Sequence, residues 1–153
     1  MTLPNTPFGQ AGRRPGDRSE ADWLSNVDEV RLVVPAGPEF VRLARVTATS
    51  LASRLGFSYD EIEDLRLAVD ELCHAVIGPS GRAGTVSLLY ITESDGLSVE
   101  GTGHFDPVGP PVALSETTRQ ILSALTDDHN LRDEDDGTPT VWFRKLRAGR
   151  HGT

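Results

Sequence analysis

Apolar residues recur with helical spacing along residues 59–77. The recurring positions are Leu65, Val69, Leu72 and Val76. Alternating intervals of four and three residues place such positions on one side of a helix, which can then pack on a core. Ser58 and Glu61 have the spacing of a capping box, and the glycine- and proline-rich stretch 78–84 ends the pattern. The pattern therefore predicts a helix over residues 59–77.

An earlier helix is predicted from Pro38 to Gly56. Proline suits the first turn of a helix, and glycine commonly caps the last one. The face that we expect to point inward consists of Phe40, Leu43, Ala44, Thr47, Leu51 and Leu55. Ahead of this helix, residues 28–35 alternate between apolar and polar types, which predicts a strand.

Short alternating segments after the two helices predict a hairpin. Residues 85–93 and 97–102 have the pattern of strands, and Ser-Asp-Gly at 94–96 suits a tight turn between them. Residues 103–111 are rich in glycine and proline, so we expect no regular structure there.

The remainder of the chain predicts one more helix and one more strand. Ser115 can cap a helix over residues 116–129, and the acidic run 133–137 is typical of a solvated hairpin tip. A strand is expected over 138–148, with one face formed by Val141 and Phe143. Trp142 has the opposite phase, and two interpretations remain open: it covers the other face of the sheet, or it lies in an interface.

The predicted elements follow the order strand, helix, helix, strand, strand, helix, strand. Two helices between the first strand and the hairpin do not fit a simple alternating parallel sheet. We therefore predict an α/β fold, a two-layer sandwich with a mixed, mainly antiparallel sheet and helices on one face. One domain is expected over residues 25–147, between a disordered arm at 1–24 and a frayed end at 148–153.

Composition narrows the classes of function. The chain has 153 residues, of which 37% are hydrophobic, so one domain can form a core without a metal or a disulfide. A formal net charge of −8 argues against direct binding to nucleic acid, which needs a concentrated basic surface. The single cysteine, Cys73, falls in the helical stripe and is expected to be a buried thiol. We find no apolar run as long as a membrane span and no signal peptide, and therefore expect a cytoplasmic protein that does not bind membranes.

Glu71 needs a separate explanation. Helical spacing groups it with Ala68 and Ala75, beside the apolar stripe and away from the charged face. Two interpretations remain open: a boundary residue whose carboxylate reaches water, or a carboxylate that faces a pocket.

The order of elements resembles the small RsbW-like anti-sigma factors, and so do three segments, at 35–72, 121–128 and 137–145. These proteins are serine kinases related to the GHKL ATPases, and they hold stress and sporulation sigma factors inactive. The resemblance extends over residues 28 to 147 and implies the GHKL, or Bergerat, fold.

In that family one helix carries a Glu that acts as the general base and, four residues later, an Asn that coordinates Mg²⁺. The resemblance assigns these positions to Glu71 and Ala75. Residues one helical turn apart project side by side, which suits the two roles. Alanine has no ligand atom, so we expect the metal site to be lost.

The family's adenine motif is an Asp followed by two glycines, and it is degenerate here. Aligned through Phe-Asp-Pro at 105–107, its positions hold Glu100, Thr102 and His104. A shift by one residue places Gly101 and Gly103 at the glycines but Val99 at the acid. A third motif, a glycine-rich turn before the last helix, reads LSETTRQIL and contains no glycine. We therefore expect no working MgATP site and no other cofactor.

The partner surface is a further implication of the resemblance. The segment LARVT at 43–47 matches the family segment whose arginine contacts the sigma factor and its antagonist; that arginine is Arg45, and we include Arg42 in the surface. A guanidinium can make charge-assisted hydrogen bonds with a partner carboxylate.

The resemblance thus implies an anti-sigma factor that sequesters an alternative sigma factor without catalysis. An anti-anti-sigma protein of the STAS type would release the sigma factor, and a homodimer is expected. Two alternatives remain: an active serine kinase that phosphorylates the antagonist with Glu71 as its base, and a non-catalytic adaptor for antagonist-type proteins.

Overall fold

The computed structural model describes residues 28–106, 112–133 and 138–148. The arm predicted over residues 1–24 lies outside the described residues. The same is true of most of the predicted hairpin tip at 133–137 and most of the predicted frayed end at 148–153.

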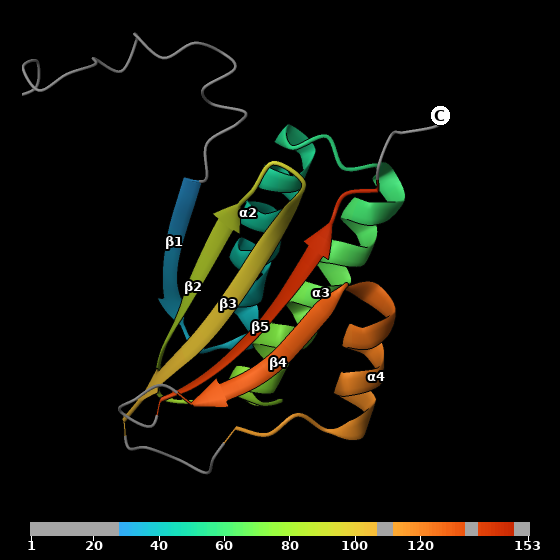
Figure 1. Cartoon of the computed structure of the whole chain (residues 1–153). Helices are drawn as coiled ribbons and strands as arrows, with labels where there is room; N and C mark the ends of the chain where they lie inside the picture. Colours follow the sequence, from blue (N-terminus) through green and yellow to red (C-terminus); the bar gives the residue numbers. More distant parts are fainter. Residues whose placement is uncertain (1–27, 107–111, 134–137, 149–153) are drawn as a thin grey trace, which may run out of the picture.

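Five strands form one sheet in the order β1-β2-β3-β5-β4, and every neighbouring pair is antiparallel (Figure 1). The strands are β1 (Asp28–Pro35), β2 (Gly84–Thr92), β3 (Gly96–Phe105), β4 (Asp128–Asp133) and β5 (Pro139–Leu146). The predicted α/β sandwich is confirmed, with a sheet that is wholly antiparallel.

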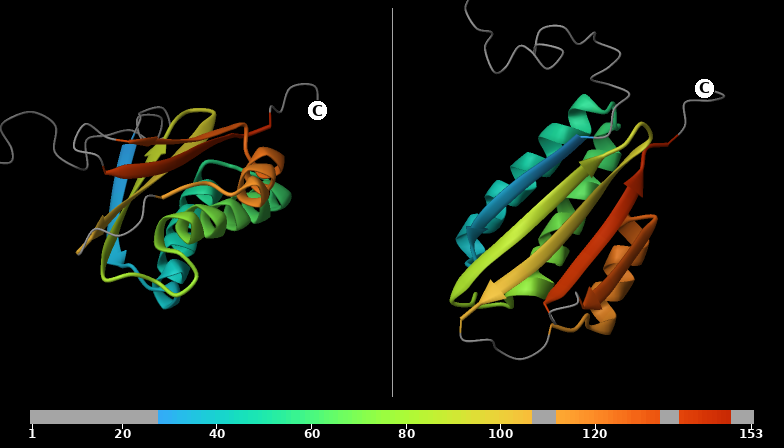
Figure 2. Two further views of the ribbon diagram at one scale, coloured as in Figure 1. Left: turned by 90° about the horizontal axis from the view of Figure 1, so that it is seen from below. Right: turned by 60° about the vertical axis from the view of Figure 1, so that its left-hand side comes forward.

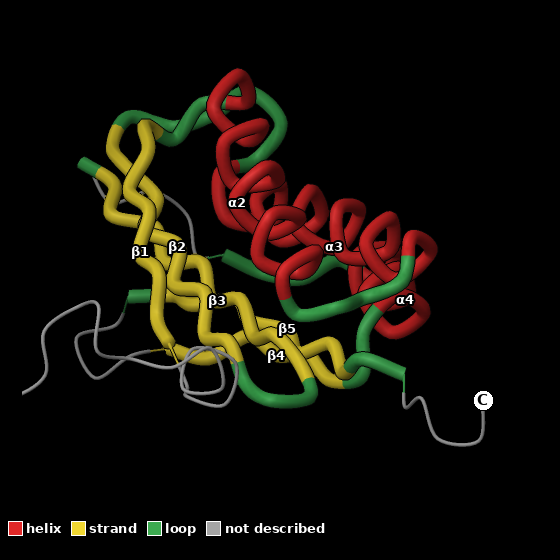
Figure 3. Tube along the Cα trace, turned by 90° about the horizontal axis from the view of Figure 1, so that it is seen from above, coloured by secondary structure: helices red, strands yellow, loops and turns green. Residues whose placement is uncertain are grey.

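The helices cover one face of this sheet, and among the described residues no helix lies on the other face (Figures 2 and 3). They are the short 3-10 helix η2 (Pro38–Phe40), α2 (Val41–Arg54), α3 (Tyr59–Ile77) and α4 (Glu116–Leu125). Helix α3 packs between α2 and α4. Its side chains therefore reach both neighbours as well as the sheet.

Helix α3 begins and ends where the sequence predicts. The Ser58 hydroxyl accepts a hydrogen bond from the Glu61 amide at 3.2 Å, and the Glu61 carboxylate accepts one from the Ser58 amide at 2.7 Å. This capping box satisfies two amides that a helix start leaves free. The predicted apolar stripe is fully buried at Leu65, Val69, Leu72 and Val76.

Three boundaries differ from the prediction by three residues or more. The helix predicted from Pro38 begins as the 3-10 helix η2, and α2 starts at Val41. Helix α4 ends at Leu125, and the residues that follow form the unpredicted strand β4 at the edge of the sheet. Only Leu131 gives β4 an apolar side chain, so no alternating pattern marks it in the sequence. Strand β3 continues to Phe105, through residues expected to be irregular, because Gly84 on β2 pairs with Phe105.

The predicted inward face of α2 is wrong at Leu43, whose side chain is 49% exposed. The fully buried residues of α2 are Ala44, which the prediction included, and Ala48 and Ala52, which it did not. Small side chains at intervals of four let the helix backbone approach the layer beneath it, and larger apolar residues then fall on its flanks. Because the helix backbone lies so close to the sheet, the Tyr90 hydroxyl can donate to the Ala44 carbonyl, at 2.9 Å.

Lys145 ties β5 to the helical layer. Its ammonium donates to the Leu125 carbonyl at 2.9 Å and lies 3.7 Å from the Asp64 carboxylate. An ammonium with so little exposure needs such partners, because it has lost most of its hydration. The last turn of α4 is thereby linked to both β5 and α3.

Cys73 lies in the core, as predicted. Among the described residues, no helix combines the length and the apolar character needed to cross a membrane.

The buried thiol and phenol should make stability depend on alkaline pH. Burial raises the pKa of the Cys73 thiol to about 12, with the Asp70 carboxylate acting in the same direction, and burial also raises the pKa of Tyr90. Above about pH 9 the unfolded chain loses protons that the folded chain keeps, so the free energy of unfolding should fall as pH rises. Below that pH this contribution is fully present and constant.

Urea denaturation at a series of pH values measures this effect. The Cys73→Ala variant is the control: the loss from the thiol should vanish, and a remaining loss from Tyr90 should begin nearer pH ~10. Identical pH profiles for the two proteins would contradict a buried, protonated thiol.

Candidate functional site

Glu71 contacts the first turn of α4. The Thr118 hydroxyl donates to Glu71 Oε1 at 3.3 Å. Thr118 is itself held by Ser115, the N-cap of α4, whose hydroxyl accepts from the Thr118 amide at 3.0 Å and donates to the Thr118 hydroxyl at 3.1 Å. The half-buried carboxylate therefore lies beside a helix N-terminus, where the helix dipole favours negative charge. A structural role in fixing α4 follows directly from these contacts.

Ala75, one turn further along α3, borders an open cavity of about 470 Å³. The cavity lies at the end of α3 and is also lined by Gly78, Arg82 and Val112. Arg82 stacks over the Phe105 ring with its guanidinium carbon 4.0 Å from the ring centroid. Glu71 is not among the lining residues, and Ala75 contributes only a methyl group.

Glu100, Thr102 and His104 lie on the other face of the sheet. Glu100 forms an ion pair with Arg132 on β4 at 3.2 Å, and the hydroxyls of Thr102 and Thr140 are 2.9 Å apart. Successive side chains of a strand point to opposite faces. The structure therefore does not bring these three side chains together with Glu71 and Ala75.

Gly101 and Gly103 alternate with Glu100, Thr102 and His104 along β3, and a side chain at either glycine would point toward the helices. A Cβ added to Gly101 would lie 2.5 Å from Leu72 Cδ2, and one added to Gly103 would meet the Phe105 ring. These glycines thus let α3 and neighbouring side chains approach β3 closely. The space directly beside them is filled by the side chains of Leu72, Val76 and Phe105.

The residues present do not match what MgATP requires in this part of the molecule. Across the described residues, no group of three or more His, Cys, Asp and Glu side chains could hold a metal ion. Ala75 lacks a ligand atom, and Glu116 adds negative charge to the first turn of α4. We derive no chemical step that involves a nucleotide.

Arg45 belongs to α2, and its side chain reaches α3. One of its terminal nitrogens donates to Asp70 Oδ2 at 3.4 Å, and both side chains are about one-third exposed. The other oxygen, Asp70 Oδ1, is buried without a hydrogen-bond partner among the described residues. A guanidinium has five N–H donors, so this single contact leaves Arg45 able to bind a further carboxylate. Arg42 is exposed one turn earlier on α2.

Two apolar side chains extend this surface. Leu43 is 49% exposed and Val46 is 53% exposed, both on the side of α2 that faces away from its buried alanines. The sequence analysis did not identify these two side chains as exposed. The helical phase of Ala44, Ala48 and Ala52 could have shown this, because it places the alanines on the opposite side of the helix. We call Arg42, Leu43, Arg45 and Val46 the α2 surface.

Comparison with known proteins finds similar chains that include several serine-protein kinases RsbW, and no family model matches. The chain is 39% identical over 88 residues to serine-protein kinase RsbW of Bacillus pumilus, covering 52% of this chain and 54% of that one. It is 40% identical over 78 residues to RsbW of Bacillus subtilis, covering 49% of each. It is 52% identical over 131 residues to RsbW of Oceanobacillus iheyensis, covering 72% of this chain and 83% of that relative. The chain thus spans about half the length of the two Bacillus relatives.

Proposed function

The chain belongs to the family of the RsbW serine-protein kinases, and from this we propose that it acts as an anti-sigma factor. It sequesters an alternative sigma factor and blocks the docking of that factor onto RNA polymerase. An anti-anti-sigma protein of the STAS type competes for an overlapping surface and releases the sigma factor. The protein acts as a homodimer in the cytoplasm.

The observation that carries this proposal is the α2 surface. It combines two exposed apolar side chains, Leu43 and Val46, with the arginines at positions 42 and 45. Exposed apolar groups next to arginine are typical of protein interfaces, where arginine is often an energetic centre. Asp70 holds the Arg45 guanidinium on α3, so part of the entropy cost of ordering that side chain is met before a partner arrives.

The proposed mechanism is mutual exclusion without phosphoryl transfer. Ala75 stands where a metal ligand would be needed, and Glu100 lies across the sheet from Glu71. The relatives are named serine-protein kinases, so the alternative function is phosphorylation of the antagonist with Glu71 as the base. The adaptor alternative keeps the α2 surface but has no sigma factor as its partner.

A binding experiment with two arms tests the proposal. Each alternative sigma factor of the source organism is mixed with the purified chain, and complexes are measured by size-exclusion chromatography with light scattering. We expect one sigma factor to co-elute at micromolar concentrations, equally well with and without MgATP. Addition of a STAS-type protein should then release it.

The second arm separates the alternatives. Bound MgATP raises the melting temperature of a protein that binds it in the folded state, so a working site should give a shift at millimolar nucleotide. We expect no shift, and no transfer of phosphate to a serine of the STAS-type protein. Phosphate transfer would establish the kinase instead, and binding of STAS-type proteins with no sigma factor retained would establish the adaptor.

A further inference from the structure

Strand β1 is an edge strand, and no described strand pairs with its outer side (Figure 1). Backbone contacts at its two ends show which groups point inward, toward β2. The Asp28 amide donates to Thr92 Oγ1 at 3.1 Å, and just past the other end the Ala36 amide donates to a β2 carbonyl at 3.0 Å. Backbone direction alternates along a strand, so the N–H and C=O groups that point outward belong to Glu29, Arg31 and Val33.

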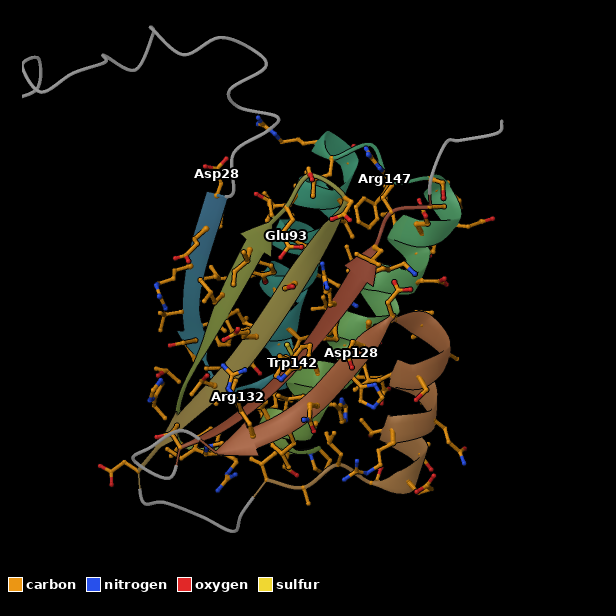
Figure 4. All side chains as sticks on the ribbon, viewed as in Figure 1. Asp28, Glu93, Asp128, Arg132, Trp142 and Arg147 are labelled. Atoms are coloured by element: carbon orange, nitrogen blue, oxygen red, sulfur yellow. The ribbon has the colours of Figure 1, made fainter. Side chains whose placement is uncertain are left out.

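The same edge carries two opposite charges. Glu29 and Arg31 are exposed, lie two residues apart on the face of the sheet opposite the helices, and form no ion pair with another described residue. On the strands farther into the sheet such charges are paired, as for Arg144 and Glu93 at 3.1 Å (Figure 4). The outer side of β1 therefore offers backbone groups and charges that the described part of the chain does not use.

These charges match a second copy of the same strand. When two β1 strands pair antiparallel about a twofold axis at Val30, Glu29 of each copy lies opposite Arg31 of the other. Residues with outward backbone groups form the hydrogen-bonded pairs of such a ladder, with Cα atoms about 5.5 Å apart, so each pair exchanges two main-chain hydrogen bonds as well as opposite charges. Charges of one sign would protect an edge from pairing, whereas opposite charges at this spacing favour it.

Other twofold registers fit less well. An axis at Glu29 or at Arg31 places like charges directly opposite each other, which is destabilising. An axis at Leu32 places Glu29 opposite Pro35, which has no N–H to donate. The Pro35 carbonyl also accepts already from the Gly37 amide, at 2.9 Å. The axis at Val30 is therefore the register that this strand favours.

The other edge of the sheet is less suited to pairing. Strand β4 has six residues, and the amides of His129 and Leu131 already donate to side chains of the same strand at 2.9 and 2.8 Å. Its arginine, Arg132, forms an ion pair with Glu100 at 3.2 Å (Figure 4). The two edges thus differ, and only β1 combines outward backbone groups with unpaired opposite charges among the described residues.

We propose that β1 pairs with β1 of a second copy about a twofold axis at Val30, which joins the two sheets into one. Val30 points toward the helical layer and is only half-buried. Across the axis it meets its own copy in a non-hydrogen-bonded pair, where side chains approach most closely, and the apolar surface that is removed from water favours association.

This interface rests on the proposed function, because it gives the homodimer of that proposal a defined surface. The twofold axis runs perpendicular to the sheet, so both helical layers lie on the same side of the joined sheet. The α2 surface belongs to the helical layer and not to the paired strands, so it stays open to the sigma factor in each copy.

Charge reversal in the full-length chain tests the register. Glu29→Arg leaves one variant with two basic side chains at this edge, and Arg31→Glu leaves another with two acidic ones. We expect the native chain to form a dimer at micromolar concentrations in sedimentation, and each single variant to associate at least about tenfold more weakly, because both pairs of the dimer become repulsive. An equimolar mixture of the two variants should associate again, and so should the double variant, because the opposite charges then meet once more.

A cross-link gives a second, independent readout. Cα atoms of a non-hydrogen-bonded pair are about 4.5 Å apart, which lies within the range of a disulfide. Val30→Cys in the Cys73→Ala background, which has no other cysteine, should therefore form a disulfide-linked dimer on mild oxidation. Leu32→Cys in the same background is the matched control, because it marks the rival axis and should stay uncross-linked. Circular dichroism should show the same folded content in all variants.

The outcomes separate this interface from the proposed function. A chain that stays monomeric at every concentration overturns both the interface and the homodimer. A dimer that tolerates both charge reversals, or that cross-links at position 32 and not at position 30, overturns the interface alone. If the chain passes both tests but retains no sigma factor, the interface stands and the anti-sigma proposal falls.

Discussion

Replacing Leu72 with alanine is expected to lower the free energy of unfolding by about 2–5 kcal/mol, the usual cost of truncating a fully buried leucine. Leu72 has no exposed surface and lies on α3 against β3. Equilibrium urea denaturation measures the loss. Leu67→Ala is the matched control on the same helix, because Leu67 is 43% exposed and should change stability by only about 0.5 kcal/mol.

A second substitution sharpens this prediction. In the native chain, Gly101→Ala should cost about 1–3 kcal/mol, because the new Cβ would lie 2.5 Å from Leu72 Cδ2. In the Leu72→Ala background the same methyl group enters the space that Leu72 vacates, and its next neighbour is Leu88 Cδ2 at 3.6 Å. Gly101→Ala should therefore be neutral or stabilising there. Additive losses in this double-mutant cycle would show that α3 and β3 are not packed as described.

Replacing Arg45 with glutamate should weaken binding of the sigma factor by at least about 30-fold, if the proposed function is right. Reversing a charge at a hydrogen-bonded interface pair commonly costs about 2–5 kcal/mol, since it removes an attraction and adds a repulsion. Titration calorimetry or surface plasmon resonance measures the affinity. Arg54→Glu is the matched control, because Arg54 is exposed in the last turn of the same helix and outside the α2 surface.

The ion pair with Asp70 must be separated from the interface effect. Arg45→Glu places two carboxylates together and should also reduce stability, whereas Asp70→Asn keeps the arginine and removes its charged partner. Asp70→Asn should therefore retain most of the affinity. If Arg45→Glu and Arg54→Glu reduce affinity equally, the α2 surface does not contact the partner.

Helix α3 could be predicted to the residue because its determinants are local. The capping box at Ser58 and Glu61 and the glycine at position 78 define its ends, and its stripe has the correct period. Strand β4 could not be predicted in this way. Its stability comes from pairing with β5, a contact that five polar residues and one leucine do not encode in their own pattern.

In the candidate site too, features set by local sequence could be predicted, whereas contacts between distant elements could not. The position of Glu71 on α3 follows from helical phase, but its contact with Thr118 depends on where α4 packs. Glu100 was aligned with a nucleotide motif by resemblance to the family, although strand alternation alone indicates its direction. If Leu97 and Val99 face the core, then Glu100 must face away from it.

Helix α4 is fastened mainly at its two ends. Glu71 holds Thr118 in the first turn, Lys145 holds Leu125 in the last turn, and Leu122 is the one fully buried residue of this ten-residue helix. With so little apolar anchoring, we expect α4 to detach from the sheet at a lower free energy than α3. Its amide hydrogens should exchange with solvent together, ahead of those in α3, while the rest of the fold stays closed.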